Sequence, residues 1–172
     1  MKFALISTLV VAAVATGGDW IWATFLSRHL MIAGLLHGAL LCLAMGFVLA
    51  IPSRRLLAGA GAGLLVGVAA AGLFYLLAPL LRMGAMLPAW FALWVMLSAA
   101  ARALAVGSRS WRDTLLRGIV AGVLSGAAFY MVSGMWTAWD PAAIDYPEHF
   151  ARWAFAFAPG FLALQASRTA PV

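Results

Sequence analysis

Residues 30–51 read LMIAGLLHGALLCLAMGFVLAI, a run of 22 residues without Asp, Glu, Lys or Arg. A helix needs roughly 20 predominantly apolar residues to cross a hydrocarbon core of about 30 Å. Apolar residues occupy every side of this run, whereas a strand of a membrane barrel alternates polar and apolar residues. The run therefore predicts a transmembrane α-helix.

The rest of the chain has the same character. Of the 172 residues, 66% are hydrophobic and 9% are charged, and the mean hydropathy is +1.02. A soluble core of this size does not bury so much apolar surface, so the composition predicts a membrane protein without a separate soluble catalytic domain. The single cysteine, Cys42, excludes internal disulfides and clusters of thiolate metal ligands.

Charged and turn residues divide the chain into six apolar runs. We expect residues 1–172 to form one integral membrane domain, an all-α, polytopic bundle of six transmembrane helices. The expected helices cover about 3–18, 30–51, 56–81, 83–104, 114–136 and 150–166. The first run also resembles a signal peptide, because Lys2 precedes a short apolar stretch with small residues near its end.

The distribution of charge predicts that both termini are cytoplasmic (N-in/C-in). In this orientation the cytoplasmic connections hold eight of the eleven Lys and Arg residues, and the outer connections hold four of the five acids. The net charge of +6 is then a topology signal, and we expect no nucleic-acid partner. The predicted location is the inner (plasma) membrane, with membrane lipids as partners.

Two expected helices carry glycines at every fourth residue, as in a glycine zipper. Residues 56–69 match residues 115–128 at eight positions, either through duplication or through shared composition bias. Glycines four residues apart lie on one helical face, where they allow close helix packing. A glycine-walled substrate path and an oligomer interface are the alternatives. The predicted packing positions are Gly59, Gly63, Gly67, Gly118, Gly122 and Gly126.

The polar residues do not form a recognisable catalytic motif. The sequence lacks paired metal-binding histidines, a phosphate-binding loop and a serine elbow. We therefore expect no enzymatic activity, no metal and no cofactor. His37 is the one ionisable side chain clearly inside an expected span. Its structural role would be a hydrogen bond to a neighbouring helix. The functional alternatives are contact with a ligand, proton relay and ligation of haem.

Charged and aromatic residues gather at the expected outer ends of the helices. They predict either a ligand pocket between the first, second and last helices or an ordinary aromatic belt with surface ion pairs. We expect Asp19 to lie close enough to Arg28, Arg82 or Arg152 for direct or water-mediated pairing, because a lone carboxylate at the edge of hydrocarbon is costly. The candidate ligand-binding residues are Asp19, Trp20, Arg28, His29, His37, Arg82, Trp136, Asp140, Glu148 and Arg152.

These patterns favour a non-enzymatic membrane protein that binds or translocates a small or lipidic molecule through an outward-facing pocket. The alternative is a structural or accessory subunit, which packs against a membrane-protein partner or another copy of itself. An intramembrane enzyme is a distant third.

Overall fold

The computed structural model describes residues 1–105, 110–132 and 144–165, and these residues are organised almost entirely as helices. The α-helices in the described ranges are α1 (Lys2–Ile21), α2 (Leu30–Ala50), α3 (Leu56–Leu81), α4 (Met86–Leu104), α5 (Trp111–Val132) and α6 (Tyr146–Gln165). Because these ranges contain no strand, the all-α prediction is confirmed.

Short helical segments extend several of these helices beyond their expected bounds. A π-helix, Trp22–Leu26, continues α1, and 3-10 helices cover Ile51–Ser53 and Arg82–Ala85. Since no breaker follows residue 18, α1 runs on through Asp19, which therefore lies inside a helix and not in a connection. The helix α6 begins at Tyr146, where the side chain of Asp145 accepts a hydrogen bond from the Glu148 backbone N–H at 3.0 Å.

Four segments of the described chain are long and apolar enough to cross a membrane. They are Lys2–Leu26, Leu30–Ser53, Leu56–Leu104 and Trp111–Val132. The third segment contains both α3 and α4. The helix α6 falls outside this set, because Glu148, His149, Arg152 and Gln165 lower its hydropathy.

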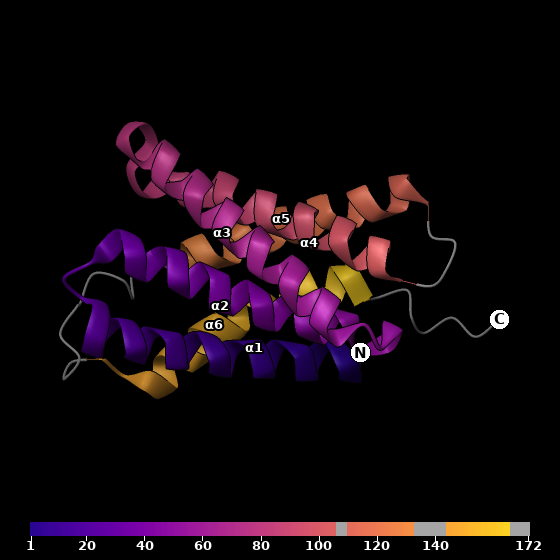
Figure 1. Cartoon of the computed structure of the whole chain (residues 1–172), viewed down its shortest axis with the longest axis horizontal. Helices are drawn as coiled ribbons and strands as arrows, with labels where there is room; N and C mark the ends of the chain where they lie inside the picture. The colour runs from indigo at the N-terminus through magenta and orange to yellow at the C-terminus, as the bar shows by residue number, and fades with distance from the viewer. Residues whose placement is uncertain (106–109, 133–143, 166–172) are drawn as a thin grey trace.

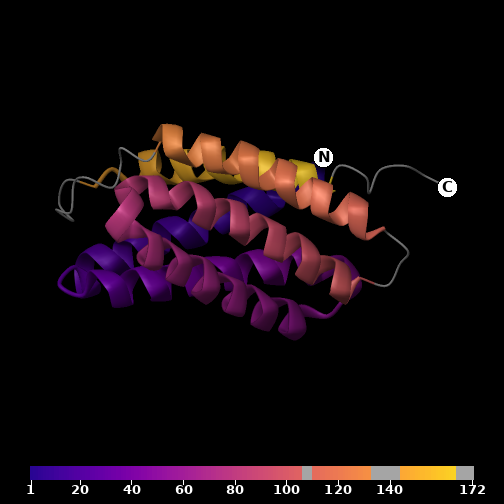
Figure 2. The same cartoon turned by 90° about the horizontal axis from the view of Figure 1, so that it is seen from above.

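The six α-helices close into a ring. Each packs against the next along the chain, and α6 also packs against α1. Figures 1 and 2 show the helices running side by side along one long axis. We call the end where α1, α3 and α5 begin the proximal end, and the opposite end, where they finish, the distal end. At the proximal end the side-chain amide of Gln165 donates a 3.3 Å hydrogen bond to the Ser7 hydroxyl, which ties α6 to α1.

Glycines bring α2 and α3 into backbone contact in the proximal half of the bundle. A Cβ atom built on Gly46 would lie 2.9 Å from the Gly63 Cα, and one built on Gly63 would lie 3.0 Å from the Gly46 Cα. Gly59 meets the same part of α2, and a Cβ on Gly67 would lie 2.9 Å from the Ala39 Cα. These three glycines of α3 therefore face α2.

The glycines of α5 face α4 instead. A Cβ atom on Gly118 would lie 3.0 Å from the Val95 Cα, and one on Gly122 would lie 3.0 Å from the Phe91 Cα. Gly126 has more room, because its nearest neighbour would be the Trp90 Cβ at 3.6 Å, an ordinary contact. The two glycine-bearing helices thus belong to two different closely packed helix pairs.

Two glycines of α3 provide a matched test of this packing. We expect Gly63→Ala to lower the free energy of unfolding by about 1–3 kcal/mol, because the added methyl group forces α2 and α3 apart. Gly61 has no heavy atom within 4 Å of an added Cβ, so we expect Gly61→Ala to be neutral or to stabilise the helix by up to about 1 kcal/mol. Unfolding in mixed micelles measures both effects, and equal effects at the two positions would contradict the assigned interface.

Candidate functional site

A buried carboxylate joins α1 to α6 near the distal end. Asp19 is only 5% exposed. Its Oδ2 atom accepts a 2.6 Å hydrogen bond from the indole N–H of Trp153 and lies 3.1 Å from Nδ1 of His149. Since His149 and Trp153 lie four residues apart on α6, one helical face supplies both groups.

His37 on α2 is the third neighbour of this carboxylate. Its Nε2 atom lies 3.8 Å from Oδ1 of Asp19, and its ring stacks on that of Trp153 at a centroid distance of 5.7 Å. Gly18 makes room for the imidazole, because a Cβ at that position would lie 2.7 Å from Nδ1 of His37. We call Asp19, His37, His149 and Trp153 the Asp19 cluster.

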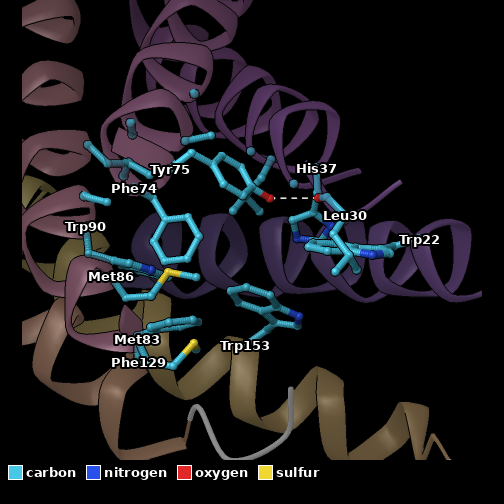
Figure 3. A pocket seen from close by; sticks show the side chains of 18 residues that line it. Trp22, Leu30, His37, Phe74, Tyr75, Met83, Met86, Trp90, Phe129 and Trp153 are labelled. Carbon is cyan, nitrogen blue, oxygen red and sulfur yellow. Dashed lines mark hydrogen bonds between the residues drawn. The ribbon is translucent and has the colours of Figure 1, made fainter. Parts of the chain in front are cut away.

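A cavity of about 360 Å³ lies beside the Asp19 cluster (Figure 3). Its walls come mainly from α2, α3 and α4. The lining residues are Trp22, Leu30, Gly34, His37, Gly38, Leu41, Gly67, Ala70, Ala71, Phe74, Tyr75, Met83, Met86, Ala89, Trp90, Leu93, Phe129 and Trp153. Leu30 and Met83 are themselves exposed, which places the mouth of the cavity at the distal end.

Small residues of α2 and α3 form one wall of this cavity. They bring the two helices into close contact, because a Cβ on Gly67 would lie 2.7 Å from the Gly38 carbonyl carbon and one on Gly38 would lie 3.2 Å from the Ala71 Cβ. Large aromatic residues then enclose the space from the other helices.

The aromatic wall is a continuous stack of rings. The ring of Trp90 lies 4.5 Å from that of Phe129 and 6.4 Å from that of Trp153, with interplanar angles of 24° and 20°. Trp153 also stacks on Phe157, at 5.2 Å and 5°. Stacked contacts of this kind hold side chains in fixed orientations, so the wall is preorganised.

Tyr75 links the two helices at the mouth of the cavity. Its hydroxyl donates a 2.8 Å hydrogen bond to the carbonyl oxygen of Leu30 (Figure 3). The ring passes over Gly34, where a Cβ would lie 2.9 Å from the Tyr75 Cζ. This hydrogen bond holds the distal ends of α2 and α3 together across the cavity.

The structure brings together two of the predicted ligand-binding residues, Asp19 and His37. Glu148 and Arg152 form an ion pair with each other at the surface of α6. The remaining candidates that the structure describes, Trp20, Arg28, His29 and Arg82, are exposed. Trp136 and Asp140 lie outside the described residues.

The expected direct pairing of Asp19 with an arginine is not found among the described residues. There its hydrogen-bonding partners are Trp153 and His149, and its ion pairs are with His37 and His149. Arg28 and Arg82 are exposed, and Arg152 binds Glu148. Histidine and tryptophan reach Oδ2 of the carboxylate because they lie on the face of α6 that packs against α1.

The walls of this cavity lie mainly on α2, α3 and α4, whereas the expected pocket lay between the first, second and last helices. Trp22, His37 and Trp153 bring residues of that expected region to its lining, and the Asp19 cluster joins α1 to α6 beside it. Sequence reasoning missed Phe74, Tyr75, Trp90 and Phe129 as lining residues. One available signal was the pair Phe74-Tyr75, which directly follows the small-residue stretch of α3.

No group of three His, Cys, Asp or Glu side chains in the described ranges is arranged to hold a metal ion. Comparisons with protein-family models, with curated proteins and with solved structures find no match to this chain.

Removing the carboxylate tests the α1–α6 junction. We expect Asp19→Ala to lower the free energy of unfolding by about 1–3 kcal/mol, because it leaves the buried indole N–H of Trp153 without its acceptor. The control is Glu148→Ala, which breaks a surface ion pair and is expected to cost at most about 1 kcal/mol. Denaturant unfolding in detergent gives both values.

A double-mutant cycle with Trp153→Phe isolates the hydrogen bond itself. Substitutions of residues in direct contact show a coupling of about 0.5–3 kcal/mol. Strictly additive effects of Asp19→Ala and Trp153→Phe would contradict the contact.

Proposed function

We propose that this chain is a multi-pass membrane protein that binds a small, largely apolar molecule in the cavity between α2, α3 and α4. The observation that carries the proposal is the cavity itself. Its volume of about 360 Å³ falls within the range of about 300–1,000 Å³ typical of small-molecule sites. Such sites are lined mainly by apolar and aromatic side chains, as this one is.

Membrane insertion with six spans and both termini in the cytoplasm is part of the proposal. Four long apolar segments support it, one of which contains two helices. The contact between Ser7 and Gln165 supports an even number of crossings, because it joins the beginning of α1 to the end of α6. In this topology the distal end, with the mouth of the cavity, faces outward.

Binding is favoured over catalysis because two polar groups beside the cavity are already held in hydrogen bonds within the protein. The indole N–H of Trp153 donates to Asp19, and the hydroxyl of Tyr75 donates to the Leu30 carbonyl. A catalytic acid or base instead needs to reach a reacting atom of the substrate. Molecules that enter the cavity therefore meet mainly ring faces, methyl groups and thioethers.

Filling the cavity tests the binding proposal. We expect native mass spectrometry of the wild-type protein, released from lipid nanodiscs, to show a discrete retained molecule. Ala71→Phe places a ring in the cavity and is expected to abolish retention, whereas Ala69→Phe adds the same ring at an exposed position of α3. Equal retention by both variants would overturn the assignment of this cavity. Stoichiometric retention of a second protein in place of a small molecule would favour an accessory subunit.

Accessibility of engineered cysteines tests the topology. In a Cys42→Ala background, we expect a cysteine replacing Ser27 to react with an impermeant thiol reagent added to intact cells. We expect a cysteine replacing Ser53 to react only after the membrane is permeabilised. Ser27 lies between α1 and α2 and Ser53 between α2 and α3, so the reverse pattern would contradict the proposed orientation.

A further inference from the structure

Aromatic residues line the cavity from several helices. Six aromatic residues line it, from five different helical segments: Trp22, Phe74, Tyr75, Trp90, Phe129 and Trp153 (Figure 3). The face of an aromatic ring carries the negative part of its quadrupole and attracts cations. Several such faces around one space form the kind of aromatic cage that binds quaternary ammonium groups.

The carboxylate of Asp19 lies directly behind this wall. Two lining residues, Trp153 and His37, turn nitrogen atoms toward it, at 2.6 Å from Oδ2 and 3.8 Å from Oδ1 respectively. An acceptor with negative charge polarises the indole that donates to it, which increases the electron density of the Trp153 ring. The field of the carboxylate also extends into the cavity with little screening, because the space between them is apolar.

In the described part of the chain, the ion-pair neighbours of Asp19 are the imidazoles of His37 and His149. Its Oδ1 atom has no hydrogen-bond partner there. No described Lys or Arg side chain lines the cavity or forms an ion pair with Asp19. A buried carboxylate is costly without positive charge near it, and a cation in the cavity adds positive charge beside the Asp19 cluster.

We infer that the cavity binds a bulky organic cation, a tertiary or quaternary ammonium group carrying apolar or aromatic substituents. The inference rests on the proposed binding function and specifies its ligand class. Such a cation is weakly hydrated and needs no directional hydrogen bonds. The lining fits such a ligand, because the Tyr75 hydroxyl and the Trp153 indole already donate their hydrogen bonds to other groups of the protein. Anions are excluded by the Asp19 carboxylate and by the negative ring faces.

A pair of isosteric probes separates charge from shape. Benzyltrimethylammonium and neopentylbenzene differ in that a quaternary carbon replaces the charged nitrogen. Isothermal titration of the wild-type protein in phosphatidylglycerol nanodiscs, whose headgroups carry no ammonium group, with empty nanodiscs subtracted, measures the affinity for each. We expect the cation to bind at least about tenfold more tightly than the neutral isostere. A difference of this size in affinity is what a desolvated cation–π contact contributes.

Two variants assign the preference to the proposed groups. Asp19→Asn keeps an oxygen acceptor for Trp153 but removes the charge, and we expect it to reduce the preference for the cation. Phe74→Leu removes one ring face and is expected to weaken binding of the cation more than binding of the neutral probe. Its control, Phe155→Leu, changes an exposed residue of α6 outside the cavity and is expected to leave both affinities unchanged. The Phe74 comparison remains available if Asp19→Asn fails to fold.

The outcomes distinguish this inference from the binding proposal on which it rests. Equal affinities, or tighter binding of neopentylbenzene to the wild-type protein, would overturn the cation inference and leave an apolar binding site. Binding of neither probe, together with the absence of a retained molecule in native mass spectrometry, would overturn both.

Discussion

The hydrogen bond from Trp153 to the buried carboxylate of Asp19 holds the ring of helices closed. It joins α1 and α6 across 134 positions of the sequence, and His149 reinforces it from the same face of α6. A carboxylate so deeply buried needs strong partners, so the ends of these helices have little freedom to separate. The position of the Trp153 ring, and with it the aromatic wall of the cavity, follows from this contact.

Small residues perform two different tasks along the α2–α3 pair. In the proximal half, Gly46 and Gly63 let the backbones touch, and contacts of this kind replace the hydrophobic driving force that is missing between helices in lipid. In the distal half, Gly34 and Ala71 belong to the wall of the cavity, and Gly34 leaves room for the ring of Tyr75. The difference arises from the neighbours, since Phe74 and Tyr75 occupy the distal end of α3 and hold large rings at the edge of the space.

The Asp19 cluster and the cavity share two side chains, and this connects structure to the proposed function. His37 and Trp153 each contact the carboxylate with a nitrogen-bearing edge and also line the cavity. Any occupant therefore lies one ring away from a buried charge. In the proposed topology the site opens outward beside exposed Leu30 and Met83.

Sequence alone determined the local properties of the helices. The charge-free run 30–51 predicts an apolar helix because hydropathy and length depend on neighbouring residues only. The spacing of Gly59, Gly63 and Gly67 places them on one face for the same reason, since helical periodicity is a local property. The predicted starts of the fourth helix at residue 83 and of the sixth at residue 150 differ from the observed starts at Met86 and Tyr146. A 3-10 segment precedes α4, and the side chain of Asp145 caps the first turn of α6.

Tertiary structure alone decided which groups meet. Three arginines were sequence candidates to pair with Asp19, but the carboxylate binds His149 and Trp153, because only their face of α6 packs against α1. The rings of Trp90 and Phe129 read as ordinary apolar residues in the sequence, and they become a cavity wall only when α4 and α5 stack them. Contacts between distant helices depend on how complete surfaces fit together, and no local pattern of residues encodes that fit.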